Sequence, residues 1–250
     1  KTAYELMPSL VGSEMCIRDS HKNDYIDMTG IYINGVSGKM GANLLKRSTK
    51  DSNVEIYNDL NDKFIDVIID FSYPDSTIEL LKFVSNKNIS VIIGTTGLNI
   101  ENIQFIKEIS KDKRILLAPN LSRGISVLKN NIVDFLRAND KELHCLIEET
   151  HHAQKIDSPS GTAIELKKII ELNNTKNLIH EVEVTSKRTG KIFGIHKVTF
   201  YKDANKIEFK HESKSRNIYS DGALDAAQWL KDQKNGLYSF EDYLKSQNSL

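Results

Sequence analysis

The sequence predicts a doubly wound α/β fold, with a parallel sheet covered on both faces, and a second α+β domain with a mixed or antiparallel sheet. Short β-rich runs alternate with longer segments of helical period, which is typical of parallel strands joined by crossover helices. The runs are nearly continuous in Val, Ile and Leu, as in strands buried on both faces. From residue 179 onward, β-rich runs follow one another directly, which favours a different sheet.

The first half of the chain alternates between strand and helix. "GIYING" reads as a strand and "KMGANLLKRSTK" as the helix that follows it. The further expected strands are 54–57, 66–72, 90–96 and 114–120, and the further expected helices are 76–88 and 100–112. Strands that recur after helices in this way predict the parallel sheet.

The second half begins with a long expected helix at 124–140 and a strand at 142–152, in which apolar and polar residues alternate. A helix at 160–173 and strands at 179–188, 193–202 and 205–213 follow. A helix at 221–233 and the apolar segment 236–244 are expected to pack back on the first domain. The first 27 residues fit none of this, because they have no sustained period and "MPSLVGSEMCIRDS" resembles translated sequencing-adapter read-through. We expect residues 1–27 to be a non-native or disordered extension.

Composition narrows the partners. The chain has 34 basic and 34 acidic residues, so its net charge gives no attraction to nucleic acid or to an anionic membrane. No apolar run approaches the roughly 18 residues of a membrane span. The two cysteines, Cys16 and Cys145, are too few for a disulfide framework or a zinc-thiolate site. We therefore expect a cytoplasmic protein with a small-molecule partner, and no nucleic-acid or membrane partner.

A glycine-rich turn follows the first strand. Gly35, Gly38 and Gly41 have the spacing G-x-x-G-x-x-G at a helix start, where a phosphate would meet unpaired N–H groups, as in Rossmann-like folds. Such turns also occur between strands and helices without any ligand. Two more turns, Gly94-Thr95-Thr96 and Ala118-Pro119-Asn120, are expected at the same edge of the sheet. Ligands of open α/β sheets bind at that edge, so dinucleotide binding is the leading interpretation.

A second motif, "HHAQKIDSPSGTA", places His151, His152 and Lys155 before a helix start. Adjacent strand residues face opposite sides, so the two histidines do not simply chelate one metal, and we predict no metal site. A purely structural role for the histidines is the plain alternative. In the functional interpretation His151 donates a proton and Lys155 supplies a positive charge beside it. The residues Ser160, Gly161 and Thr162 then form an anion site at the helix N-terminus, which suits a small dicarboxylic acid.

The motifs together resemble those of the bacterial 4-hydroxy-tetrahydrodipicolinate reductase (dihydrodipicolinate reductase) family of lysine biosynthesis. They are "NGVSGKMG", "IDFSYPDST", "VIIGTTGL", "APNLSRGISVL", "EETHHAQKIDSPSGTA", "RTGKIFGIHKVTF", "SRNIYSDGALDAAQWL" and "GLYSFEDYL". The resemblance implies hydride transfer from NADH or NADPH to a cyclic imine-type dicarboxylate, formed as water leaves, and a homotetramer built through the second-domain sheets.

The resemblance also implies roles for single residues. It makes His151 and Lys155 the catalytic pair. The implied substrate contacts are His152, Ser160, Gly161 and Thr162. The implied cofactor positions are Gly35, Lys39, Met40, Gly94, Thr96, Ala118 and Asn120, with Arg216 near the nicotinamide site. The expected domains are then a dinucleotide-binding domain, 28–121 with 217–250, and a substrate-binding and oligomerisation domain, 122–216.

Two segments are shorter than is usual in that family: the one between the first helix and "IDFS", and the loop before "KRTGK". The first normally carries residues that hold the adenine ribose, so the choice between NADH and NADPH stays open, with Glu55 and Asp59 as candidate acids. Two other interpretations remain open. One is a different nicotinamide-linked dehydrogenase of the same architecture, such as an amino-acid dehydrogenase, and the other is a catalytically silent NAD(P) sensor.

Overall fold

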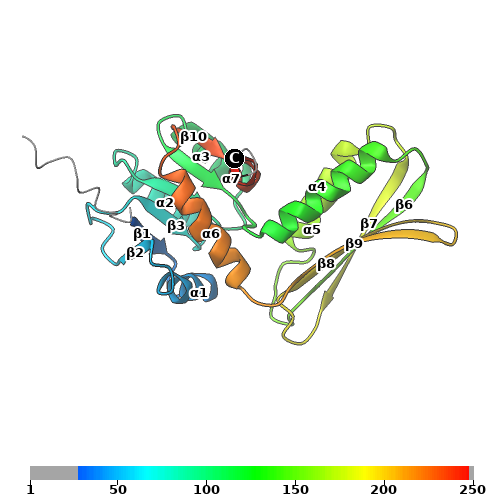
Figure 1. Cartoon of the computed structure of the whole chain (residues 1–250), viewed down its shortest axis with the longest axis horizontal. Helices are drawn as coiled ribbons and strands as arrows, with labels where there is room; N and C mark the ends of the chain where they lie inside the picture. Colours follow the sequence, from blue (N-terminus) through cyan, green and yellow to red (C-terminus); the bar gives the residue numbers. More distant parts are fainter. Residues whose placement is uncertain (1–27, 248–250) are drawn as a thin grey trace, which may run out of the picture.

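Two β-sheets organise the chain into two lobes (Figure 1). The structure, a computed structural model, describes residues 28–247. The extension expected at residues 1–27 therefore lies outside the described residues, as do residues 248–250. None of the helices within residues 28–247 is long and apolar enough to cross a membrane.

The first lobe contains a six-stranded sheet in the order β10-β5-β4-β3-β1-β2, in which every pairing is parallel. Its strands are β1 (Thr29–Asn34), β2 (Val54–Tyr57), β3 (Val67–Asp70), β4 (Ser90–Ile93), β5 (Arg114–Leu117) and β10 (Gly236–Tyr238). All residues of β3 and β4 are buried, as the Val/Ile-rich runs predict. Burying each such side chain contributes roughly 1.5–3 kcal/mol, so these central strands anchor the sheet. The predicted doubly wound architecture is confirmed.

Helices cover both faces of this sheet. The helices are α1 (Lys39–Ser48), α2 (Pro74–Phe83), α3 (Ile100–Ile109), α6 (Asn217–Leu230) and α7 (Phe240–Gln247). Side chains of α1, α6 and α7 pack against one face, beside Ile31, Val67 and Ile92. Side chains of α2 and α3 pack against the other face, beside Ile68 and Val91. Alternate residues of each strand thus enter different cores, and the carboxyl ends of the strands stay open for a ligand.

The second lobe contains a four-stranded sheet in the order β7-β6-β8-β9. Its elements are α4 (Arg123–Ala138), β6 (Leu143–His151), α5 (Gly161–Asn173), β7 (Ile179–Arg188), β8 (Gly194–Lys202) and β9 (Asn205–Ser213). β6 pairs with β7 in parallel and with β8 antiparallel, so the sheet is mixed, as predicted. α4 and α5 pack on one face around Ile132, Leu166 and Phe200, and the cartoon shows no helix of the described chain on the other face (Figure 1).

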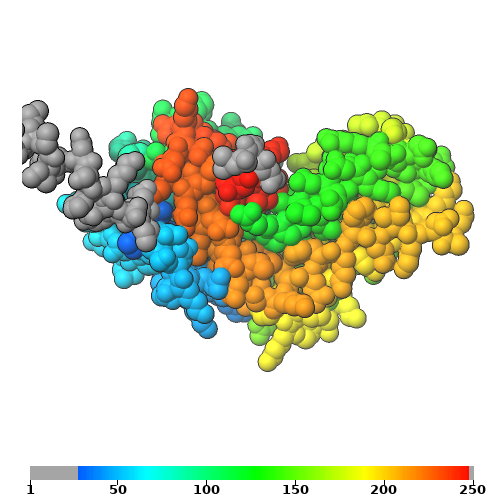
Figure 2. All heavy atoms as spheres, in the orientation of Figure 1, coloured from blue at the N-terminus to red at the C-terminus, as the bar shows by residue number. Residues whose placement is uncertain are grey.

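The chain crosses between the lobes before α4 and again before α6. In the space-filling view, α6 (orange) lies between α1 (blue) and α4 (green) (Figure 2). The start of α4 is fastened to the first lobe, because Arg123 Nη2 lies 3.3 Å from Asp225 and Lys129 pairs with Glu241 of α7. The hydrophobic cores separate in the same way as the expected domains. This supports keeping 28–121 with 217–250, and 122–216, as the proposed division.

Candidate functional site

A cavity of about 880 Å³ lies between the two lobes, at the carboxyl ends of the parallel strands. Most of the predicted site residues line it, and they come from both lobes. The first lobe contributes Met40, Gly94, Thr95, Thr96, Ala118, Pro119 and Asn120, and the other lobe and its connection to α6 contribute His151, His152, Lys155, Ser160, Gly161, Thr162 and Arg216. The remaining predicted residues, Gly35, Gly38, Lys39 and Gly41, are not among its lining residues.

The glycine loop between β1 and α1 has a backbone shape that requires glycine. Gly35 has a φ of +84°, in the left-handed region, and its carbonyl accepts a hydrogen bond from Gly38 N at 3.0 Å. A Cβ at Gly41 would overlap the carbonyl oxygen of Gly35, so α1 approaches the loop closely only with glycine there. The first-turn N–H groups of α1 therefore lie beside this loop, in an environment that favours an anion.

We expect Gly41→Ala to lower the free energy of unfolding by about 1–3 kcal/mol, the usual cost of overpacking. The added methyl would meet rigid backbone at Gly35 and Val36. Gly38→Ala is the matched control in the same loop, because its φ is −76° and its Cβ would lie 3.3 Å from the nearest atom. Chemical denaturation of both variants measures the difference. Equal losses of stability would contradict the close approach of α1.

A buried carboxylate fixes the floor of the cavity. Asp70, at the end of β3, is fully buried and accepts hydrogen bonds from Asn34 Nδ2 at 2.9 Å and Thr95 Oγ1 at 2.9 Å. The hydroxyls of Ser72 and Thr77 also donate to it. Since these donors come from three different strand ends and a helix, Asp70 holds the edge of the sheet in one arrangement.

Two polar contacts cross between the lobes at the site. Lys39 Nζ donates to Gln154 Oε1 at 3.2 Å. Asn120 Nδ2 donates to Thr162 Oγ1 at 2.9 Å and so joins the turn after β5 to the first turn of α5. Residues from the two predicted motifs therefore contact one another directly in this structure.

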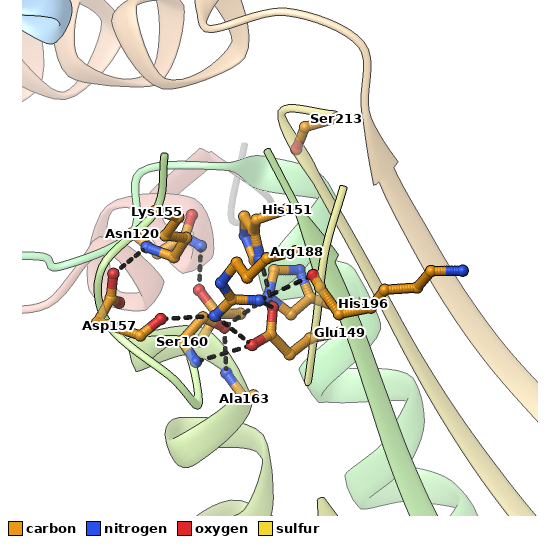
Figure 3. A network of polar contacts seen from close by, with 12 residues as sticks. Asn120, Glu149, His151, Lys155, Asp157, Ser160, Ala163, Arg188, His196 and Ser213 are labelled. Carbon is orange, nitrogen blue, oxygen red and sulfur yellow. Dashed lines mark hydrogen bonds and ion pairs between the residues drawn. The ribbon is translucent and has the colours of Figure 1, made fainter. Parts of the chain in front are cut away.

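His151, the last residue of β6, is part of a buried polar network (Figure 3). Its Nδ1 is hydrogen-bonded to Glu149, and Arg188 donates to both Glu149 oxygens at 2.7 and 2.9 Å. Burial opposes ionisation of Glu149, but hydrogen bonds led by that from Arg188 outweigh it and lower its pKa to about 2. Burial is also the largest effect on His151 and lowers its pKa, while the Glu149 carboxylate opposes that shift.

Lys155 points toward the N-terminus of α5 through an ion pair. Its Nζ lies 2.7 Å from Asp157 Oδ1, and the Asp157 carboxylate also accepts a backbone hydrogen bond from Gly161. Burial opposes ionisation of Asp157, whereas Lys155 and these hydrogen bonds lower its pKa. The N-terminus of α5 thus already holds one carboxylate, as expected of an anion site.

Ser160 caps α5 and is held by a third histidine. Its Oγ accepts from Ala163 N at 3.3 Å and lies 3.1 Å from His196 Nε2. Burial lowers the pKa of His196 to about 3, so this imidazole is neutral at pH 7 and accepts the Ser160 hydroxyl proton. The His196 ring also meets His151 edge-on, with centroids 5.1 Å apart. Ser160 and His151 are therefore held by one connected network.

Positive charge surrounds His152, which follows the end of β6 and lines the cavity. Burial is the largest influence that lowers its pKa, followed by the charges of Arg216, Lys39 and Lys155. The guanidinium of Arg216 lies over the Phe193 ring, 5.1 Å from the centroid. These cations make the cavity suitable for an anionic ligand. No group of His, Cys, Asp and Glu within residues 28–247 is arranged to hold a metal ion.

The sequence analysis assigned no role to Glu149, Arg188 or His196. Glu149 has a local signal, because it lies two residues before His151 and so faces the same side of a strand. The others depend on strand register: Arg188 of β7 pairs with His151, and His196 of β8 pairs with Glu149. Register across three strands is long-range information, which no short motif contains.

Comparisons with known proteins agree with this architecture. The family models described as dihydrodipicolinate reductase, N-terminus and C-terminus, match residues 50–121 and 124–244. The 4-hydroxy-tetrahydrodipicolinate reductase of Sulfurovum sp. is 34% identical over 254 residues, which cover 87% of this chain and 99% of that protein. The enzyme of the same name from Pelagibacter ubique is 35% identical over 248 residues, covering 85% and 96%.

A solved structure shares the fold. Dipicolinate-bound dihydrodipicolinate reductase from Paenisporosarcina sp. TG-14 superposes with a TM-score of 0.70 at 19% identity, covering 86% of this chain and 99% of that one. With both family models matched and relatives above 30% identity over most of its length, the chain belongs to the dihydrodipicolinate reductase family, whose members are nicotinamide-dependent oxidoreductases.

Proposed function

We propose that this protein reduces 4-hydroxy-tetrahydrodipicolinate to tetrahydrodipicolinate with NADH or NADPH, in the diaminopimelate route of lysine biosynthesis. The overall reaction adds a hydride and a proton to the substrate and releases one water. The observation that carries the proposal is the meeting of the two motifs in one cavity: the turns at the strand ends lie opposite His151 and Lys155. Family membership supports the same reaction.

The residues of the first lobe suit a nicotinamide dinucleotide. The close approach of Gly41 to Gly35 leaves a loop of exposed backbone at a helix start, which fits a pyrophosphate. We propose that this loop, with Lys39 and Met40, holds the pyrophosphate side. The predicted contacts nearer the nicotinamide are Gly94, Thr95, Thr96, Ala118, Pro119, Asn120 and Arg216. A bound nicotinamide supplies the hydride.

The residues of the second lobe suit a dicarboxylate. We propose that His152, Ser160, Gly161 and Thr162 bind its carboxylates at the N-terminus of α5, where Asp157 shows that a carboxylate is accommodated. His151 then donates the proton that completes the reduction, and Lys155 supports it by its charge. Among the rivals, a silent sensor would have no use for this pair in the cavity.

A coupled assay tests the proposal. The unstable substrate is generated in place from pyruvate and aspartate semialdehyde by dihydrodipicolinate synthase, and nicotinamide absorbance is followed. We expect cofactor oxidation that requires both the synthase and this protein. Oxidation of aspartate with NAD⁺, without activity in the coupled assay, would instead identify an amino-acid dehydrogenase. Cofactor binding without turnover of either substrate would identify a silent sensor.

We expect both NADH and NADPH to be used, with kcat/KM values within about 100-fold, or about 2.7 kcal/mol. Lys39 can attract a ribose 2′-phosphate, whereas an acid near the end of β2 repels it. Asp59 follows β2 at the carboxyl edge, while Glu55 lies inside the strand and accepts a hydrogen bond from Tyr57 at 2.8 Å. Lys39→Ala should therefore impair NADPH more than NADH, and Asp59→Asn should favour NADPH. A preference beyond about 100-fold would show that one charge dominates.

We also propose that the protein is a cytoplasmic homotetramer. The uncovered face of the second sheet supports assembly, because it presents Leu146, Ile195 and Tyr201 at neighbouring positions of β6 and β8, and each is only half-buried. Light scattering of the full chain measures the assembly, and a monomer at assay concentration would contradict it.

A further inference from the structure

We propose that Glu149, held by Arg188, is a positioning residue that places the proton of neutral His151 on Nδ1 and leaves Nε2 as the nitrogen that exchanges a proton with the substrate. This inference rests on the proposed function, since it deepens the role given to His151. It assigns a task to a buried carboxylate that the reaction itself does not consume.

The burial of Glu149 is the first argument. Glu149 is 1% exposed, and its carboxylate is fully enclosed. An ionised carboxylate in such a place is costly unless it is paired and hydrogen-bonded. Arg188 provides the pairing through two parallel hydrogen bonds, the geometry in which guanidinium binds carboxylate most firmly. Glu149 is consequently a fixed anion on the wall of the site.

The hydrogen-bond inventory of Glu149 is the second argument. Oε1 accepts from Arg188 Nη2 at 2.7 Å and from Ser160 N at 3.2 Å. Oε2 accepts from Arg188 Nη1 at 2.9 Å and is bonded to His151 Nδ1. An ionised carboxylate only accepts, so His151 Nδ1 must be the donor. In the neutral imidazole Nε2 therefore has the free lone pair, and the second proton of the imidazolium binds there.

The space beside Nε2 is the third argument. A Cβ at Gly194 would lie 3.1 Å from His151 Nε2, closer than most real contacts of that kind, so glycine leaves this nitrogen uncrowded. His151 also lines the cavity. Nδ1 is thus held by the protein, and Nε2 is the ring nitrogen that remains for a ligand.

The charges around His151 give the inference a pH signature. Glu149 favours the imidazolium, whereas Lys155 and Arg188 oppose it, and neutral His196 packs against the ring. A general acid is active while protonated, so its activity is lost as the pH rises through its pKa. Removing the Glu149 charge lowers the pKa of His151. The descending limb of the kcat profile must then move to lower pH.

The main experiment compares Glu149→Gln with the full-length parent. We expect kcat at pH 7 to fall at least about tenfold, the descending limb to move down by about one pH unit or more, and KM to change only a few-fold. Glu149→Asp, which keeps the charge, should restore part of the kcat and most of the pH profile. Glu148→Gln is the matched control: it is the neighbouring residue, it pairs with Lys197 outside the cavity, and it should change nothing.

Nitrogen NMR of the imidazole rings gives a readout that needs neither substrate nor turnover. With the His151 signals assigned by their loss in His151→Gln, the parent should have Nδ1 protonated in the neutral form. The pKa of that ring should fall in Glu149→Gln. If the coupled assay shows no reductase activity, the proposed function fails while this measurement still decides the tautomer.

Two results would overturn the inference. One is a neutral His151 that carries its proton on Nε2 in the parent protein, which can be observed even if Glu149→Gln does not fold. The other is a loss of kcat in Glu149→Gln that is equal at every pH, with an unchanged His151 pKa, because a merely structural carboxylate would have that effect.

Discussion

His151→Gln should lower kcat by at least about 100-fold, since general acid catalysis contributes about 10²- to 10⁴-fold. Glutamine keeps a hydrogen-bonding side chain toward Glu149 but cannot deliver a proton from Nε2. Cofactor affinity, measured by fluorescence titration, should stay within a few-fold, because the glycine loop belongs to the other lobe. The measurement is steady-state kinetics in the coupled assay at saturating cofactor.

His152→Gln is the matched control for this variant. His152 lies beyond the end of β6 and lines the cavity among cations, so its loss should mainly raise the KM for the substrate. If His151→Gln is correctly folded and keeps a near-normal kcat, the histidine pair is structural and the proton comes from another group.

Lys155→Ala should lower kcat by a similar factor, at least about 100-fold. Its ammonium group is the cation of the second lobe that pairs with a carboxylate at the start of α5, so its loss removes charge where the substrate carboxylate and the developing charge meet. Because Lys155 and His151 act on one transition state, the double variant should fall well short of the product of the two single effects.

The interpretation of Lys155→Ala needs a test of its folding, since Asp157 loses its ion-pair partner in this variant. Thermal denaturation of Lys155→Ala beside Lys155→Met separates a loss of packing from a loss of charge. Strictly multiplicative effects in the double variant, in two stable proteins, would show that the two residues act at separate steps.

Most of the fold could be predicted from sequence because its strands are locally distinctive. β3 and β4 are unbroken apolar runs, and such runs form buried strands almost wherever they occur in this kind of fold. β10 was not predicted as a strand, because its three residues, Gly236–Tyr238, become a strand only by pairing with β5. α6 begins four residues earlier than the expected position 221, at Asn217, and no side chain caps its start to mark the boundary.

The site divides in a similar way. His151, Lys155 and the helix start at Gly161 lie within one short motif, so their proximity could be predicted from sequence. The glycine loop was also apparent, although the cavity wall itself is formed by Met40 and not by the three glycines. What sequence reasoning lacked was the support of His151 by Glu149 and Arg188. That support depends on which strands are neighbours and in what register.

Asp157 has a further consequence for how the site turns over. Its carboxylate occupies the N-terminus of α5 and the ammonium group of Lys155, yet its side chain is 56% exposed and free to turn outward. A substrate carboxylate that enters this place therefore exchanges with an internal competitor instead of filling a bare site, and each gained contact is offset by one lost. Binding is moderated for substrate and product alike, and the return of Asp157 helps to expel the product. The loop that carries the proton-transfer machinery thus also resets it.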